Sequence, residues 1–279
     1  MSKAVTQVSR QDGRAFPPLA CRIDGQGPNV VLIHGGTGSW THWIRTIPAL
    51  SDRFLVHAFD LPGCGDSPDF PVDWSDEDYF GWVAEAILTE CEGPILLVGF
   101  SFGGSVAAAV APLLGERLRA LCLVAPGSFG KPAPREVQVR PMRARAGIEV
   151  DERANARHNL GQIMFADIGS ADEATIDLQV ENVRRARFPS RRISWQDRIE
   201  TDIAPIRCPI HLIWGASDRM ATPSVVARAE KVQAIRPDAE VTLIEGGGHW
   251  IQYERAADFN GALLSFLEKF DGEANSHDL

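Results

Sequence analysis

Short runs of apolar residues recur along the chain and alternate with longer stretches of mixed apolar and polar positions. The runs are continuous rather than alternating, which is typical of strands buried on both faces of a parallel sheet. The mixed stretches at 75–91, 102–114, 222–235 and 254–270 predict helices between them. This order implies βαβ units and an α/β fold with helices on both faces of the sheet. The runs are NVVLIHGG, RFLVHAFDLPG, PILLVGFS, RALCLVAPG, PIHLIWGASD and AEVTLIEGGGH, and PPLACRID adds an early antiparallel strand.

Residues 127–203 interrupt this alternation. No run in this segment has the pattern of a strand, whereas EATIDLQVENVRRARF has helical spacing. A segment of this length is too long for an unstructured loop inside a compact domain. We therefore predict a core formed by residues 1–126 and 204–279, with a helical cap inserted at 127–203. We expect the cap to be mobile and to control substrate choice.

Composition narrows the functional classes. The chain has 279 residues, of which 44% are hydrophobic and 23% charged, and its net charge of −9 argues against nucleic-acid binding. No apolar run approaches the roughly 20 residues that span a bilayer, and the polar N-terminus lacks a signal pattern, so we expect a cytoplasmic protein without a membrane partner. Five scattered cysteines contain no CxxC pair, and we expect no metal and no cofactor. The expected partner is a small-molecule substrate. Whether the chain forms a homodimer is left open.

A single serine stands between an apolar strand and a predicted helix. Gly99-Phe100-Ser101-Phe102-Gly103 matches the G-x-S-x-G nucleophile elbow, in which small neighbours let the backbone turn sharply and expose the hydroxyl. A serine hydroxyl is a weak nucleophile, so it needs a base within hydrogen-bond reach and donors for the developing oxyanion. Ser101 is therefore the candidate nucleophile.

The partners of this serine should follow it in the chain, with a carboxylate before a histidine. His249 lies in a glycine-rich loop after the last strand, and Asp218 lies just past the strand before it. The segment APGSFG, after another strand, offers no carboxylate, which favours Asp218. Asp60, in DLPGCGDS, is better interpreted as part of a structural turn. Ser101, Asp218 and His249 are thus the predicted catalytic residues.

The oxyanion hole requires backbone N–H groups. We expect one from Phe102, the residue after the nucleophile, and one from the loop HGGTGSW, at Gly36 or alternatively Thr37. His34 opens that loop and is expected to hold its shape. A phosphate-binding role for these glycines is disfavoured, because the loop has no Walker lysine and no G-x-G-x-x-G spacing.

With these motifs in order, the chain resembles the α/β-hydrolase family over nearly its whole length. The resemblance rests on HGGTGSW, DLPGCGDS, GFSFGG, GASD and GGGHW. It implies a mostly parallel eight-stranded sheet with an inserted cap over a Ser101–His249–Asp218 triad.

A narrower resemblance is to the meta-cleavage-product hydrolases, which cleave a carbon–carbon bond in vinylogous keto acids. Trp250 follows the histidine as in that group, but Phe100 replaces the usual asparagine before the nucleophile. Glu181 stands near the position of that group's cap arginine, with Arg184, Arg185 and Arg187 close by. The predicted substrate pocket comprises Trp40, Phe100, Trp250, Arg184 and Arg187.

Three functions remain open at this point. The leading hypothesis is hydrolysis of a small carboxylic ester through an acyl-enzyme. The alternatives are cleavage of a carbon–carbon bond beside a carbonyl and a non-catalytic small-molecule-binding protein of the same fold. The aromatic residues around the motifs suit a small-molecule pocket but do not distinguish among the three.

Overall fold

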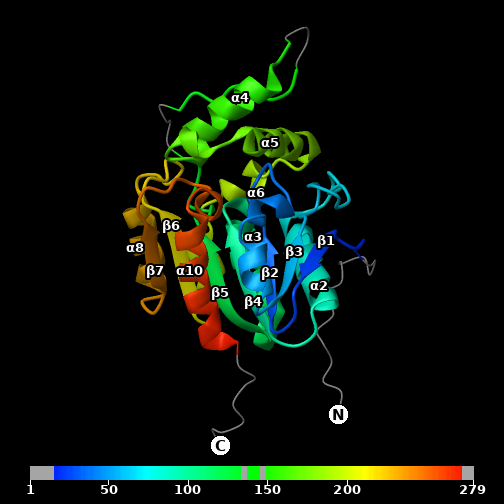
Figure 1. Ribbon diagram of the computed structural model, residues 1–279. Helices are drawn as coiled ribbons and strands as arrows, with labels where there is room; N and C mark the ends of the chain where they lie inside the picture. The colour runs from blue at the N-terminus through cyan, green and yellow to red at the C-terminus, as the bar shows by residue number, and fades with distance from the viewer. Residues whose placement is uncertain (1–15, 133–136, 145–148, 272–279) are drawn as a thin grey trace, which may run out of the picture.

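A seven-stranded sheet forms the centre of the structure, a computed structural model that describes residues 16–132, 137–144 and 149–271. The strand order is β1-β3-β2-β4-β5-β6-β7, and every pair is parallel except β1 with β3 (Figure 1). The central strands are buried throughout, as their continuous apolar runs predict. The strands are β1 (Cys21–Asp24), β2 (Asn29–Ile33), β3 (Leu55–Phe59), β4 (Ile95–Phe100), β5 (Leu118–Val124), β6 (Ile210–Gly215) and β7 (Glu240–Ile244).

The strand number differs from the expected eight. Among the described residues one strand, β1, precedes β2, and one strand, β7, follows β6, so the sheet is one strand short of that expectation. The early antiparallel strand predicted from PPLACRID is present as β1. The mostly parallel α/β architecture is confirmed.

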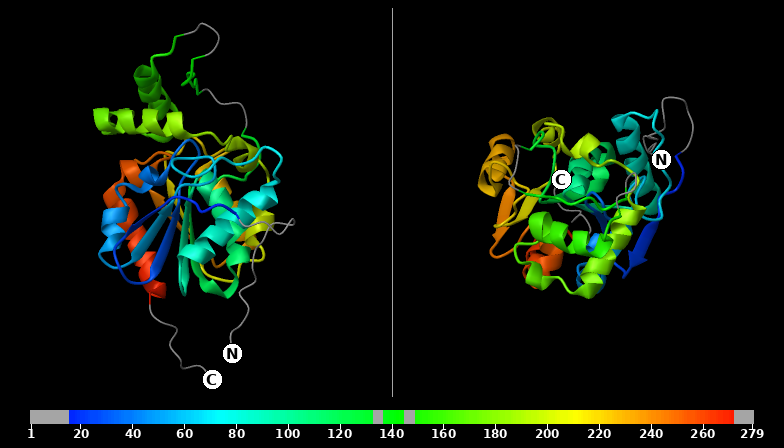
Figure 2. Two further views of the ribbon diagram at one scale, coloured as in Figure 1. Left: turned by 90° about the vertical axis from the view of Figure 1, so that its right-hand side faces the viewer. Right: turned by 90° about the horizontal axis from the view of Figure 1, so that it is seen from above.

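Helices cover both faces of the sheet. Helices α2 (Asp76–Glu90), α3 (Phe102–Leu114) and α8 (Val225–Ile235) lie on one face, and α1 (Ile47–Ser51) and α10 (Ala256–Leu267) pack together on the other (Figure 2). The helix α2 begins at a reciprocal capping box, in which Ser75 and Asp78 each accept a hydrogen bond from the other's backbone N–H. The shorter helices of the core are η1 (Trp40–Trp43), η2 (Gly115–Arg117), α9 (Ile251–Glu254) and η5 (Glu268–Phe270).

In the described part of residues 127–203 the regular elements are helices, joined by irregular stretches and by one isolated β-bridge between Phe129 and Asp197. Its helices are α4 (Glu152–Asn159), the π-helical turn Leu160–Met164, η4 (Ile168–Ser170), α5 (Glu173–Arg185), α6 (Arg191–Ser194) and α7 (Ile199–Ile203). Figure 1 shows α4 and α5 stacked beyond one end of the sheet, whereas α7 packs against α3 and α8 of the covering layer. The segment therefore extends over the sheet edge and then returns to the core.

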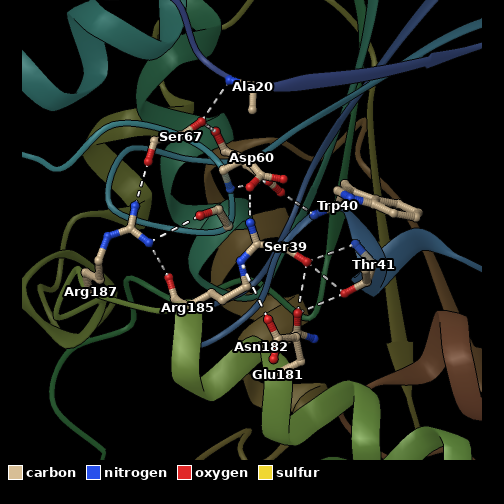
Figure 3. A network of polar contacts seen from close by, with 12 residues as sticks. Ala20, Ser39, Trp40, Thr41, Asp60, Ser67, Glu181, Asn182, Arg185 and Arg187 are labelled. Carbon is tan, nitrogen blue, oxygen red and sulfur yellow. Dashed lines mark hydrogen bonds and ion pairs between the residues drawn. The ribbon is translucent and has the colours of Figure 1, made fainter.

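Polar contacts fasten α5 to the loop after β2 (Figure 3). The carboxamide oxygen of Asn182 accepts hydrogen bonds from the hydroxyls of Ser39 and Thr41, each at 2.9 Å. Asn182 and Ser39 are buried and Thr41 is partly buried, so these bonds are largely shielded from water. They join residues more than 140 positions apart in the sequence and hold the inserted segment against the core.

The loop after β3 is held by a buried carboxylate. Asp60 accepts the N–H of Trp40 at 2.7 Å and the N–H of Asp66 at 2.9 Å, which supports its interpretation as a turn residue. The Asp66 carboxylate pairs with Arg185, and Arg187 donates to the carbonyl of Ser67 at 2.6 Å (Figure 3). The same loop therefore also binds the end of α5.

No helix in the described ranges combines the length and the apolar character needed to cross a membrane.

We predict that the protein loses stability as pH falls from 6.5 toward 4, in part through His211. This β6 side chain is 3% exposed and lies 2.8 Å from the hydroxyl of Thr242 on β7. Burial lowers the pKa of His211 to about 4, from an ordinary 6.5. Between those values the unfolded chain binds a proton that the folded chain does not, so stability rises with pH there.

The measurement is urea unfolding of the wild type and His211→Gln between pH 7 and pH 4.5. The free energy of unfolding should depend less steeply on pH in the variant, with a slope smaller by up to about 1.4 kcal/mol per pH unit. Parallel slopes for the two proteins would show that His211 does not carry this pH dependence.

Candidate active site

Ser101 occupies a strained turn between β4 and α3. Its backbone φ is +53°, in the left-handed region that side-chain-bearing residues rarely adopt. The turn is held by two bonds, from the N–H of Ser101 to the carbonyl of Val124 and from the N–H of Gly127 to the carbonyl of Ser101, at 2.8 and 3.0 Å. The hydroxyl is therefore presented at a fixed place on the carboxyl edge of the sheet.

Two glycines make this turn sterically possible. A Cβ on Gly103 would collide with the carbonyl oxygens of Ile33 and His34, and one on Gly99 would collide with the carbonyl oxygen of Gly103. Without these side chains, the first turn of α3 lies directly against the end of β2. The spacing of the elbow glycines thus follows from backbone-to-backbone contact.

A chain of hydrogen bonds links the three predicted catalytic residues. The Ser101 Oγ lies 2.9 Å from His249 Nε2, and His249 Nδ1 lies 2.8 Å from Asp218 Oδ2. A carboxylate can only accept, so Nδ1 of a neutral ring carries the proton and Nε2 accepts from the serine hydroxyl. The side chains of His249 and Asp218 are 6% and 1% exposed. This arrangement can take a proton from Ser101 and stabilise the imidazolium that results.

Loops after β6 and β7 bring the acid and the base together. The second carboxylate oxygen of Asp218 accepts the N–H of Met220 at 2.7 Å, which fixes the carboxylate's orientation. The Glu254 carboxylate accepts the N–H of Gly248 at 2.6 Å, and it also accepts from Ala166 in the inserted segment at 3.1 Å. Glu254 therefore ties the residue preceding His249 to the segment that covers it.

Two buried histidines shape the glycine loop after β2. His34 Nε2 accepts the N–H of Leu61 at 2.9 Å, so its Nδ1–H donates to the carbonyl of Gly35 at 2.7 Å. His42 Nδ1 accepts the N–H of Gly35 at 3.1 Å. Burial lowers the pKa of both rings, which keeps them neutral and able to accept these bonds.

Two adjoining cavities open beside Ser101 and His249. The larger has a volume of about 350 Å³, within the usual range for small-molecule sites, and the smaller about 50 Å³. Most of the larger cavity's lining is apolar, including Val137, Val139, Ile163 and Met164. Gly36, Thr37 and Phe102 line it as well, so the backbone positions expected to form the oxyanion hole face the space next to Ser101. Phe102 starts α3, and the helix provides no acceptor for its N–H.

The residues expected in the substrate pocket lie elsewhere. Phe100 and Trp250 are fully buried: Phe100 packs behind the His249 ring at 5.2 Å between centroids, and Trp250 donates to the carbonyl of His42. Trp40 borders a separate hollow with Asp60. None of the three is among the described residues that line either cavity.

The arginine positions also require correction. Arg184 pairs with Glu152 of α4 at 2.5 Å, and Arg187 pairs with Asp69 in the loop after β3. Both are exposed, and neither belongs to the described lining of the two cavities. Their charges are used in contacts at the surface, because carboxylates distant in sequence lie within reach.

The inserted segment supplies further lining residues that were not predicted from the sequence. Ser190, Arg191, Ser194 and Trp195 come from α6 and its ends, and they border the larger cavity with Ser101. The only signal for them in the sequence is their place near the return of the segment to the core. No motif marks PSRRISW, and its position depends on how the whole segment packs.

A mostly parallel sheet with a hydrogen-bonded serine, histidine and aspartate at its carboxyl edge defines an enzyme of the α/β-hydrolase class. The chain belongs to the α/β-hydrolase family, whose family model matches residues 30–262. No group of three His, Cys, Asp or Glu side chains in the described ranges is arranged to hold a metal ion.

Individual relatives have diverse activities. The chain is 26% identical over 277 residues to a 2-hydroxy-6-oxononadienedioate/2-hydroxy-6-oxononatrienedioate hydrolase of Cupriavidus pinatubonensis, covering 93% of this chain and 94% of that protein. It is 27% identical to a dihydrolipoyllysine-residue acetyltransferase component of an acetoin cleaving system from Pseudomonas putida, over 87% of this chain but 64% of that protein. A bromoperoxidase structure from Bacillus anthracis superposes with a TM-score of 0.73 at 23% identity, over 90% and 95% of the two chains, which shows the shared fold.

We predict that Gly103→Ala displaces the elbow. The new methyl group meets backbone oxygens that cannot rotate away, so the free energy of unfolding should fall by about 1–3 kcal/mol. Hydrolysis of a p-nitrophenyl ester should fall with it, because Ser101 moves relative to His249.

The matched control is Gly261→Ala on α10, where a Cβ meets nothing within 4 Å. That change should raise the free energy of unfolding by about 0.5–1 kcal/mol through helix propensity and leave the rate of ester hydrolysis unaltered. Urea unfolding measures the change in stability, and nitrophenolate release measures the change in the rate of hydrolysis. Wild-type stability and activity in Gly103→Ala would contradict the steric account.

Proposed function

We propose that the protein is a serine hydrolase that cleaves a small carboxylic ester through an acyl-enzyme. The observation that carries this proposal is the continuous chain of hydrogen bonds from Ser101 through His249 to Asp218, at 2.9 and 2.8 Å. The hydrogen-bonded residues border a cavity of about 350 Å³ whose lining mixes apolar side chains with serine, threonine and arginine. An activated hydroxyl beside such a cavity suits attack on the carbonyl of a modest acyl group.

The geometry supports a two-stage reaction. His249 Nε2 takes the Ser101 proton as Oγ attacks the carbonyl carbon, and the N–H groups of Phe102 and Gly36 stabilise the oxyanion. The tetrahedral intermediate collapses, and His249 gives the proton to the departing alkoxide, which leaves as an alcohol. Water then loses a proton to His249 and attacks the acyl-enzyme. Ser101 regains its proton as the carboxylic acid departs. Asp218 orients the ring and stabilises its charged form throughout.

We further propose that residues 127–203 act as a cap that selects substrates. Its side chains contribute much of the larger cavity's lining, including Met164, Ser190 and Trp195. The hydrogen bonds that Asn182 accepts from Ser39 and Thr41 hold one side of this segment to the core, so we expect any opening motion to occur elsewhere in it.

Replacing the nucleophile tests the reaction type. Ser101→Ala should lower kcat for a p-nitrophenyl ester by a factor on the order of 10³ to 10⁶, because the oxyanion donors and the cavity remain while the attacking group is lost. The wild type should also react covalently with a fluorophosphonate probe at Ser101, and the variant should not. Mass spectrometry of the labelled peptide identifies the residue. Undiminished turnover in the variant would rule out Ser101 as the nucleophile.

Carbon–carbon bond hydrolysis is the second candidate. It is supported by the similarity to a hydrolase named for 2-hydroxy-6-oxo dienedioates and by Trp250 following His249. The cap arginines expected to anchor its acidic substrate, Arg184 and Arg187, pair with Glu152 and Asp69 instead. A non-catalytic binding protein is the third candidate, and failure to react with the fluorophosphonate would favour it.

A paired assay separates the first two candidates. Release of nitrophenolate from p-nitrophenyl butyrate and loss of absorbance of a 2-hydroxy-6-oxo-dienoate are measured with the same enzyme preparation. We expect kcat/KM for the ester to exceed that for the dienoate by at least about tenfold, a difference of 1.4 kcal/mol in transition-state stabilisation. The reverse preference would establish carbon–carbon cleavage as the function.

A further inference from the structure

Arg191 is a cation at the active-site cavity whose role the reaction above does not explain. It begins α6, is exposed, and lines the larger cavity together with Ser101 and His249. Its guanidinium carbon lies 4.9 Å from the centroid of the Trp195 ring, and Trp195 lines both cavities. Stacking of this kind holds a guanidinium in place without occupying its N–H donors.

Carboxylates satisfy the neighbouring arginines but not Arg191. Between positions 184 and 198, each of the five arginines besides Arg191 forms an ion pair. Arg191 forms none with the described residues. The partners of Arg184, Arg185, Arg187, Arg192 and Arg198 include Glu152, Asp66, Asp69, Asp76 and Asp202, respectively. Arg191 therefore differs from its neighbours in both position and pairing.

The charge balance of the cavity favours an anion. Among the described residues that line the larger cavity there is no Asp or Glu, and the ionisable side chains are Arg191 and His249. Arg228 borders the smaller cavity, but its guanidinium donates to the carbonyls of Thr222, Pro126 and Met220 at 3.2–3.3 Å. Lys131 adds a second positive charge, 6.0 Å from the Trp195 ring centroid.

We propose that Arg191 binds a carboxylate on the substrate, so that the cavity takes esters whose acyl chain ends in a carboxylate. This inference rests on the proposed ester hydrolysis and specifies its substrate class. The apolar side chains of Val137, Val139, Ile163 and Met164 would accommodate the methylene chain between the two ends. A planar guanidinium can accept a carboxylate in a bidentate arrangement, which would fix the position of the scissile carbonyl at Ser101.

The test compares two esters that differ by one methyl cap. They are 4-nitrophenyl hydrogen adipate and methyl 4-nitrophenyl adipate, both followed by nitrophenolate release. The wild type should prefer the acid. Arg191→Gln should lower kcat/KM for the acid about tenfold, chiefly through KM, and change the capped ester less than about twofold. Arg191→Lys, which keeps the charge, should retain part of the preference, and added salt should weaken it.

Arg157→Gln is the matched control, because it removes one arginine from the same segment. Arg157 pairs with Glu173 and is not among the described residues lining the cavities. Its selectivity between the two esters should equal that of the wild type. The same acid-to-capped ratio in wild type and Arg191→Gln would overturn the proposal, as would an equal loss in Arg157→Gln.

Failure of the proposed ester hydrolysis is recognised separately. It would appear as no turnover of either ester and no fluorophosphonate labelling of Ser101. Calorimetry then measures binding of adipate and of monomethyl adipate to the wild type and to Arg191→Gln. Tighter binding of adipate that is lost in Arg191→Gln supports carboxylate recognition without catalysis. Undetectable adipate binding, or equal binding by both proteins, overturns it.

Discussion

The contact between the first turn of α3 and the end of β2 determines where Ser101 stands, and the rest of the site is arranged around that serine. Gly103 lies so close to the carbonyls of Ile33 and His34 that even one methyl group has no space. Protein interiors are packed too densely to absorb that methyl without a shift of the backbone. The contact brings Phe102, at the start of α3, next to Gly36 in the loop after β2. The strained φ of Ser101 is tolerated because this packing and the bonds to Val124 and Gly127 determine it.

Parallel topology explains why much of this site could be predicted from the sequence. Strands β2, β4, β6 and β7 run in one direction, so the loops that follow them meet at one edge. Ser101, Asp218 and His249 each follow one of these strands closely, and a local pattern marks each position. Strand runs, elbow glycines and loop order are local properties of the chain. They predicted the sheet and the hydrogen-bonded residues, although the described sheet has seven strands rather than eight.

The substrate-facing residues could not be predicted in the same way, because their environment depends on contacts between distant parts of the chain. Phe100 and Trp250 flank the motifs in sequence, but they pack into the ring cluster behind His249. Arg184 and Arg187 form a basic cluster in sequence, and only the fold shows that Glu152 and Asp69 neutralise them. Arg191 is also an arginine of this segment, but it has no carboxylate partner among the described residues and lines the larger cavity. Composition and spacing contain no information that separates these cases.

The proposed carboxylate-binding role of Arg191 is distinct from the proton transfer in the proposed reaction. Proton transfer from Ser101 creates an imidazolium at His249, in the same cavity as the guanidinium. Arg191 is exposed whereas His249 is buried, so water screens the guanidinium from the ring. The buried Asp218 carboxylate is the charge nearest the ring. The contact with Arg191 would therefore act on the binding and placement of an acidic ester rather than on the proton transfer, and a neutral ester of equal length would lack that contact.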